Sequence, residues 1–185
     1  MQLKAEFYKL LVRFDAQRLA EEISVFTAAD WLPHPQNYPG NAALLLMRND
    51  GEADHRVGFA GALQQVLASF NTTLGNTRLM RIDGGGEATP HIDVNYYWLQ
   101  RVRIHIPIVT FPEVRFICGQ ASVQMAPGET WLFNTWKKHN VVNPSEHQRI
   151  HLVIDTVGSP DFWQRVDEAE PFTAKTTHPT HPKIP

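Results

Sequence analysis

Residues 77–93, TRLMRIDGGGEATPHID, decide the fold class, because they open a run of short strands that continues to residue 156. Residues 77–82 and 88–93 have the composition of strands, and three consecutive glycines separate them at residues 84–86. Further strands are expected at residues 101–109, 114–118, 122–125, 130–133, 139–142 and 149–156. Turn signals such as Pro127-Gly128 and Asn143-Pro144 stand between them. The second half of the chain therefore predicts an array of short strands.

The first 76 residues contain the two helices that we expect. Residues 6–14 are typical of a strand, after which Asp15 is expected to cap a helix that runs to Phe26. Residues 31–40, with three prolines, predict a loop, and residues 43–48 another strand. Residues 58–70 carry apolar side chains at helical spacing. Helices first and short strands after predict a mainly β sandwich or small barrel, with N-terminal helices backing one sheet.

Length and composition indicate one domain. The chain has 185 residues, and we expect a single domain over residues 1–169, with its core at about 58–156. From residue 170 to 185 the sequence holds four prolines and no apolar period, which predicts a flexible tail or linker.

Charge and cysteine content narrow the classes of partner. Seventeen basic and nineteen acidic residues give a net charge of −2, so neither nucleic acid nor another polyanion is an expected partner. No run of about 18 apolar residues is present, so no membrane span is expected. Cys118 is the single cysteine, which excludes an internal disulfide and a cysteine-based zinc cage. The first residues do not resemble a secretory signal, and we expect a cytoplasmic protein.

A set of metal-binding side chains occupies the middle of the chain. His91 and Asp93 are two residues apart, so on a strand they point to one face, and His139 follows Asp93 by 46 residues. Two imidazoles and one carboxylate form the facial triad that is typical of non-haem Fe(II) oxygenases. The remaining iron positions can take a 2-oxo acid and O2. Because Asp93 occupies the position that a halide would need, hydroxylation is favoured over halogenation.

Polar residues on two strands are candidates for binding the 2-oxo acid. Arg149 lies ten residues after His139 and shares a strand face with His151. An inward guanidinium needs an anion, and 2-oxoglutarate offers a carboxylate for a two-bond fork. The alternative for Arg149 is a structural ion pair. For His151 the pattern favours a hydrogen-bonded core position over a place in the site. Arg103 and His105 share a face of the strand at 101–109, which could instead be a solvated face.

Three segments resemble the aspartyl/asparaginyl β-hydroxylase family of 2-oxoglutarate oxygenases, which includes bacterial hydroxylases of free proline. They are TRLMRIDGGGEATPHID (77–93), RVRIHIPI (101–108) and PGETWLFNTWKKHNVVNPSEHQRIHLVIDT (127–156). The resemblance implies a double-stranded β-helix, the jelly-roll or cupin-like fold. It implies Fe(II) on His91, Asp93 and His139, and 2-oxoglutarate on Arg149 with Arg103 and His105 beside it. Some relatives lack the metal-binding carboxylate, whereas this chain has Asp93.

Residues near the metal motif are candidates for contacting the substrate. Tyr97 and Trp98 follow the motif, and Trp136 and Lys137 precede His139, so both pairs are expected at the same mouth. Aromatic and cationic groups suit an amino-acid-like substrate that carries a carboxylate, whether free, peptidyl or bound in a natural product. The alternative is that these aromatic residues only pack loops. The sequence does not indicate an oligomeric state.

The sequence thus favours an Fe(II)- and 2-oxoglutarate-dependent hydroxylase. Two other classes are compatible with parts of the pattern. One is a cupin-like metalloenzyme that does not use 2-oxoglutarate, against which Arg149 argues. The other is a non-catalytic binding module on the same barrel, against which the intact set of metal ligands argues.

Overall fold

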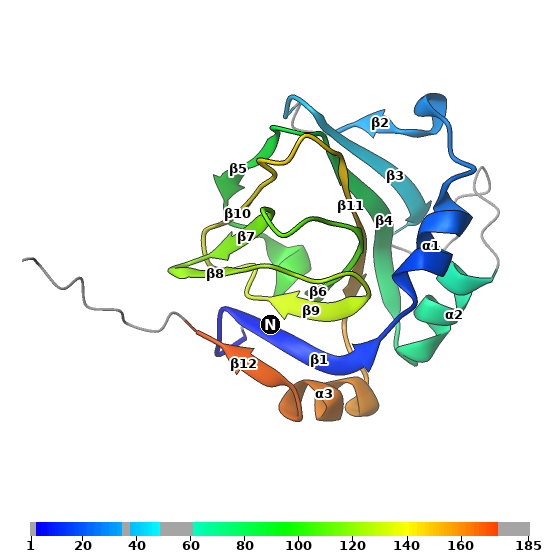
Figure 1. Ribbon diagram of the computed structural model, residues 1–185. Helices are drawn as coiled ribbons and strands as arrows, with labels where there is room; N and C mark the ends of the chain where they lie inside the picture. Colours follow the sequence, from blue (N-terminus) through cyan, green and yellow to red (C-terminus); the bar gives the residue numbers. More distant parts are fainter. Residues whose placement is uncertain (1–2, 35–37, 49–60, 174–185) are drawn as a thin grey trace, which may run out of the picture.

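The computed structural model describes residues 3–34, 38–48 and 61–173, and two antiparallel sheets dominate it (Figure 1). The strands are β1 Phe7–Arg13, β2 Leu32–Pro33, β3 Asn41–Met47, β4 Leu74–Ile82, β5 Glu87–His91, β6 Val102–Val109, β7 Arg115–Cys118, β8 Ala121–Val123, β9 Glu129–Phe133, β10 His139–Val142, β11 Arg149–Thr156 and β12 Glu170–Phe172. The α-helices are α1 Ala16–Ile23, α2 Ala62–Ser69 and α3 Pro160–Asp167, and short 3-10 turns cover Ala28–Asp30 and Tyr96–Leu99.

The larger sheet has the strand order β12-β1-β9-β6-β11-β4-β3-β2, and the smaller sheet has the order β5-β10-β7-β8. Phe7, Trp131 and Phe133 of the larger sheet form one apolar cluster with Phe116 and Val123 of the smaller sheet, so the two sheets face each other. This arrangement confirms the predicted mainly β, jelly-roll fold.

The alternation of residues along the strands divides the larger sheet into two faces. Ile104, Ile106, Leu152 and Ile154 belong to one apolar cluster with the helices, which defines the outer face of the sheet. The intervening residues point to the inner face, toward the smaller sheet. Because β11 lies between β4 and β6, the inner faces of these three strands make a continuous surface. Arg103, His105, Arg149 and His151 lie on that surface, whereas His91 and His139 belong to the smaller sheet.

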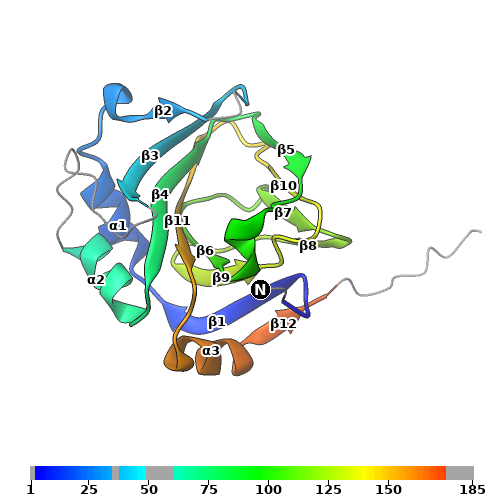
Figure 2. The same cartoon turned by 180° about the vertical axis from the view of Figure 1, so that it is seen from behind.

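Helices α1 and α2 cover the outer face, as predicted, and Figures 1 and 2 show them together on the same side of the sheet. Asp15 caps α1 as expected, since its Oδ1 accepts a hydrogen bond of 3.1 Å from the backbone N–H of Arg18. The Glu22 carboxylate of α1 accepts bonds from the N–H groups of Ala62 and Leu63 at the start of α2. This contact satisfies helix donors that would otherwise lack partners.

Several predicted boundaries were wrong. The second helix begins at Ala62, and the predicted positions 58–60 lie outside the described residues. Helix α3 was not predicted, although Ser159 caps it and Pro160 starts it. The tail expected from residue 170 instead begins with β12, in which Phe172 pairs with Phe7 of β1. A strand partner supplied by the other end of the chain explains this difference, because the local sequence carries no signal for it. None of the helices in the described ranges is long and apolar enough to cross a membrane.

Candidate active site

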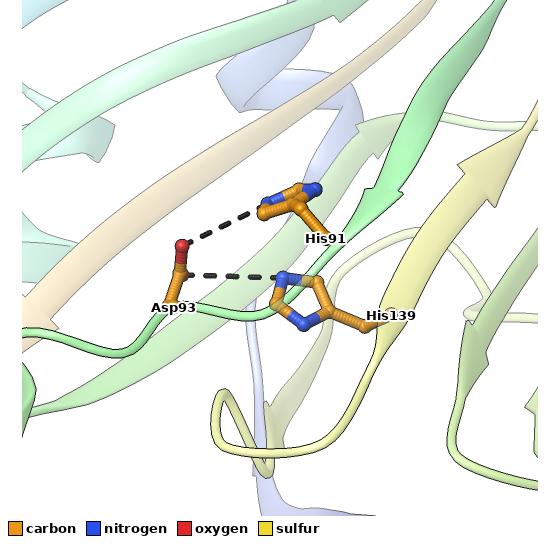
Figure 3. Close-up of side chains that lie close together, drawn as sticks. All are labelled: His91, Asp93 and His139. Atoms are coloured by element: carbon orange, nitrogen blue, oxygen red, sulfur yellow. Dashed lines mark ion pairs between the residues drawn. The ribbon is translucent and has the colours of Figure 1, made fainter.

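His91, Asp93 and His139 converge at one end of the smaller sheet (Figure 3). One potential ligand atom from each lies within 4.8 Å of the others. Asp93 Oδ1 is 3.7 Å from His91 Nε2, and Asp93 Oδ2 is 3.9 Å from His139 Nε2. His91 and His139 are direct partners in the pairing of β5 with β10. The structure thus brings together all three predicted ligands.

Asp93 reaches this group from outside the strand, which corrects the expected position. Strand β5 ends at His91, so a shared strand face does not align the two residues. The backbone N–H of Asp93 instead donates to the carbonyl of Thr135 in the loop before β10, at 3.0 Å. The loop after β5 and the loop before β10 are therefore hydrogen-bonded to each other, and this contact positions the carboxylate of Asp93.

Backbone carbonyls orient both imidazole rings. His91 Nδ1 lies 2.7 Å from the carbonyl oxygen of Thr89, and His139 Nδ1 lies 2.9 Å from that of Lys137. Each Nδ1 must donate a proton to such a bond, and in a neutral ring this leaves a lone pair on Nε2, the atom that faces Asp93. Burial lowers the pKa of His139 to about 4, so its ring is neutral at physiological pH. Neutral imidazoles with free Nε2 atoms are the form that binds metal ions.

Arg103 contacts the carboxylate of Asp93 rather than pointing freely into the site. Its Nη1 donates to Asp93 Oδ2 at 3.1 Å, and its Nε and Nη2 donate to the two oxygens of Asp155 at 2.8 and 3.2 Å. The register of β6 and β11 places Arg103 opposite Asp155. Arg103 thus links a buried carboxylate to a candidate metal ligand. A role in orienting Asp93 fits these contacts better than direct binding of a co-substrate.

Arg149 is the most deeply buried cation of the site. Its side chain is only 2% exposed, and no ion pair within the described residues compensates its charge. Its Nη2 lies 2.6 Å from His151 Nδ1, whereas its Nε has no hydrogen-bond partner there. Burial lowers the pKa of Arg149 to about 9, which reflects the unfavourable environment of its charge. An anionic ligand would relieve that cost.

His151 and His105 lie beside Arg149 in different roles. Burial and the charge of Arg149 lower the pKa of His151 well below its usual value, so its neutral Nδ1 accepts the bond from Arg149. His151 is therefore the hydrogen-bonded core histidine that the sequence favoured. Burial also lowers the pKa of His105, and neither of its ring nitrogens has a hydrogen-bond partner among the described residues.

A pocket connects these groups, and we call it the inner pocket. Its polar lining includes His91, His139, Arg103, His105 and Arg149. Its apolar lining includes Met80, Phe116, Phe133, Val141 and Val153. A ligand in this pocket can therefore contact both the buried Arg149 and the two histidines of the candidate metal site.

The four residues expected to contact substrate lie elsewhere and do not line the inner pocket. Lys137 pairs with Glu6, and the Tyr97 hydroxyl donates to Asp155 at 3.1 Å. Trp98 is 4% exposed and packs under the guanidinium of Arg103, at 4.4 Å. Trp136 is half-buried beside the loop before β10. Lys137, Tyr97 and Trp98 thus make contacts within the protein, which is compatible with the alternative that the aromatic residues pack loops, and a contact of these four residues with substrate stays a prediction.

The comparison with protein families agrees with this geometry. The sequence profile described as aspartyl/asparaginyl beta-hydroxylase matches residues 15–158. The chain belongs to this family. The match covers α1 and every strand from β2 to β11, and therefore all residues of the inner pocket. A search of curated protein sequences gave no significant match.

Solved structures share the fold of this family member at low sequence identity. A prolyl-4-hydroxylase from Pseudomonas putida has a TM-score of 0.60 and 16% identity, covering 83% of this chain and 92% of that chain. A viral collagen prolyl hydroxylase from Paramecium bursaria Chlorella virus-1, in complex with 2-oxoglutarate, has a TM-score of 0.60 and 8% identity. That alignment covers 83% of this chain and 97% of the viral chain.

Several residues of the site in this family member were missed by sequence reasoning. Arg78 and Met80 line the inner pocket from β4, and His34 lines it from the segment after β2. Strand alternation could have placed Arg78 and Met80 on one face, opposite the buried Leu79. The alternation could not have shown which face of the strand carries the site. His34 stands in the proline-containing segment, where no period indicates a direction.

Proposed function

We propose that this protein is an Fe(II)- and 2-oxoglutarate-dependent dioxygenase that hydroxylates a C–H bond of an amino-acid-like substrate and releases succinate and CO2. The family and the fold of the prolyl hydroxylases support a hydroxylase of this general class. The substrate is a small molecule or a residue of a peptide, as the names of those structures suggest.

One observation carries the proposal: a buried arginine without a carboxylate partner shares a pocket with the two histidines of a His-Asp-His group. A simple metal site needs no such cation, and an unpaired buried charge is costly. A diacid co-substrate would supply the carboxylate partner that this arginine lacks. Its far carboxylate would bind Arg149 in a two-bond fork, while its 2-oxo acid end would face the histidines.

The donor set fits Fe(II). Two imidazoles and one carboxylate are the ligand types of the facial triad, and one potential ligand atom of each group lies within 4.8 Å of the others. When bound, the iron together with 2-oxoglutarate and O2 supplies the oxidant that attacks an unactivated C–H bond. The carbonyls of Thr89 and Lys137 hold the proton on each Nδ1 and keep each Nε2 available.

Other residues of the chain would orient the reactants and exclude water. Arg103 holds the carboxylate of Asp93 in place, and His151 holds the guanidinium of Arg149. His105 is the neutral group with free ring nitrogens beside the expected position of 2-oxoglutarate, so it can donate a hydrogen bond to that molecule. Phe116 and Phe133 form apolar walls of the same pocket and limit the access of water.

Anaerobic titration with Fe(II) and then with 2-oxoglutarate, followed by visible absorption, tests the proposal. We expect a new absorption band only when both are present, and succinate after O2 is admitted. Binding of iron without any response to 2-oxoglutarate would favour a cupin-like metalloenzyme of another type. Failure to bind iron would favour a non-catalytic module. His147→Ala is a suitable control, because His147 lies in the exposed turn before β11 and outside the triad.

The cysteine content also bears on the cellular compartment of the protein. A single, buried cysteine fits a reducing compartment, and we propose the cytoplasm.

A further inference from the structure

A second pocket adjoins the candidate metal group, and we call it the outer pocket. His91, Asp93 and Arg103 contribute to its lining, so it reaches the same three-residue group as the inner pocket. Its lining lacks Arg149, His105 and His139. An aliphatic wall is formed by Leu32, Pro33, Ala43, Leu45 and Met80. A substrate placed here would contact His91 and Asp93 of the metal group without contacting the buried Arg149.

Arg78 is the cation of the outer pocket without a hydrogen-bonded partner. Its side chain is 21% exposed, and its Nη1 lies 3.9 Å from Asp155 Oδ2, too far for a hydrogen bond. No hydrogen bond from Arg78 to any described residue is present. Asp155 is already engaged, because Arg103 donates to both of its oxygens and Tyr97 donates to Oδ2. Burial and the nearby charge of Arg103 lower the pKa of Arg78, and the opposing effects of Asp155, Tyr97 and Asp93 offset this only in part.

The two arginines occupy separate levels of the inner face of the sheet. Arg149 pairs with Ile82 of β4, and Arg78 stands four residues before Ile82 on the same strand face. Four residues of strand span roughly 13 Å. Arg78 lines both pockets, whereas Arg149 lines only the inner one. A small diacid held by Arg149 in the inner pocket would therefore leave Arg78 available from the outer pocket for a second anionic molecule.

We propose that Arg78 binds the carboxylate of the organic substrate, and that this substrate is a free aliphatic acid, such as an amino acid with an unblocked carboxyl group. The inference deepens the proposed function and rests on it. A single guanidinium matches a single carboxylate in charge and in two-bond geometry, whereas a dianion would be disfavoured by Asp155 at 3.9 Å from the same guanidinium. The aliphatic wall fits a hydrocarbon body. A residue inside a peptide has no free α-carboxylate to fill the site.

The test compares binding of acids and amides by the metal-free protein, using calorimetry. The probes are valine, leucine, isoleucine, methionine and proline as free L-amino acids, and the same five as N-acetyl carboxamides. We expect at least one free acid to bind and its blocked form to bind at least tenfold more weakly. Arg78→Met should weaken acid binding by roughly tenfold to a hundredfold, the usual effect of losing a charge-assisted fork. Arg78→Lys should recover part of it.

Arg81→Met is the matched control, because Arg81 stands on the same strand, points away from the outer pocket and pairs with Asp83 at 3.1 Å. It should bind the acids as the parent protein does. Equal binding of acids and blocked forms would overturn the inference in favour of a peptidyl substrate. Absence of binding by all ten probes would overturn it too, as would undiminished binding in Arg78→Met.

Two further measurements separate this inference from the proposed function. With Fe(II) bound anaerobically, 2-oxoglutarate affinity should be unchanged in Arg78→Met. A large loss of that affinity would assign Arg78 to the co-substrate and overturn the inference, while the proposed function would stand. Conversely, acid binding that depends on Arg78, together with no succinate formation from any acid, would contradict the proposed function and support the assignment of Arg78.

Discussion

The two faces of β4, β6 and β11 differ completely, although they come from alternate residues of the same strands. The outer face buries Leu79, Ile104 and Leu152, each fully shielded from solvent, against the helices. The inner face carries Arg103 and Arg149 with histidines between them, around the two pockets. Each strand thus contributes to stability with one set of side chains and to a site with the other.

The difference shows where the molecule can tolerate charge. Burial of aliphatic groups on the outer face stabilises the fold by about 1.5–3 kcal/mol for each large side chain. The inner face instead leaves the Arg149 guanidinium without a counterion and the His105 imidazole without a hydrogen-bond partner among the described residues. Such groups destabilise the unliganded protein and become favourable only with a ligand present. We therefore expect substitutions on the two faces to separate stability from binding.

The largest expected effect is the loss of the metal on the inner side. His139→Ala removes one of three proposed ligands, and loss of even a supporting group typically weakens metal affinity about 10–100-fold. We expect Fe(II) affinity to fall by more than roughly a hundredfold and succinate formation to disappear, as measured by anaerobic iron titration and by product analysis. The melting temperature of the metal-free protein should change little. Unchanged iron affinity would exclude His139 as a ligand, with His147 and His151 as the next candidates.

Next in size is a cavity on the outer face. Leu79→Ala removes a fully buried side chain and should destabilise the protein by about 2–5 kcal/mol, measured by urea unfolding. Turnover per folded molecule should stay close to that of the parent. Met80→Ala is the matched variant, because the adjacent residue lines both pockets. It should lose less stability and more substrate affinity. Similar stability losses in both variants would show that the two faces are not separable.

Substitutions of Arg149 test the comparison between the inner and outer faces more directly. Arg149→Ala should weaken 2-oxoglutarate binding by about 1.5–3 kcal/mol, roughly tenfold to a hundredfold, with iron affinity nearly unchanged. Arg149→Lys should restore part of the affinity, because lysine supplies charge without the fork. Arg149→Met should raise the melting temperature of the unliganded protein, since it removes an unpaired buried charge. Undiminished 2-oxoglutarate affinity in all three variants would place the diacid elsewhere, with Arg103 as the next candidate.

Much of the fold follows from the sequence because local signals determine it. The period of two in residues 101–108 and 149–156 separates the faces of β6 and β11, and Asp15 marks the start of α1 as predicted. The strand β12 depends on pairing with β1 at the other end of the chain, and no local pattern reports such a partner. Strand β12 was missed for this reason, whereas α3 was missed although its start signals, Ser159 and Pro160, are local.

The candidate site divides in the same way. Ligand spacing indicated the three candidate metal ligands, but the expected substrate residues were chosen by their closeness in sequence to those candidates. Lys137 is next to that motif, yet its side chain pairs with Glu6, 131 residues away. The link between Arg103 and Asp155 depends on the register of β6 and β11, which the sequence does not reveal. Arg78 was not predicted as a site residue, because the alternation along its strand assigns it to a face but does not indicate which face holds a pocket.

The smallest expected effect lies farthest from the site. Asp15→Ala removes the side-chain acceptor for the backbone N–H of Arg18 at the start of α1, and such caps contribute about 1 kcal/mol. Because α1 packs on the outer face, the whole loss should be seen in urea unfolding, and none of it in the affinity for 2-oxoglutarate. Asp15→Asn should retain most of the stability, because asparagine also caps helices well. A measurable loss of 2-oxoglutarate affinity in Asp15→Ala would mean that strain in the helical layer passes through the sheet, so that the two faces would have to be treated as one coupled unit.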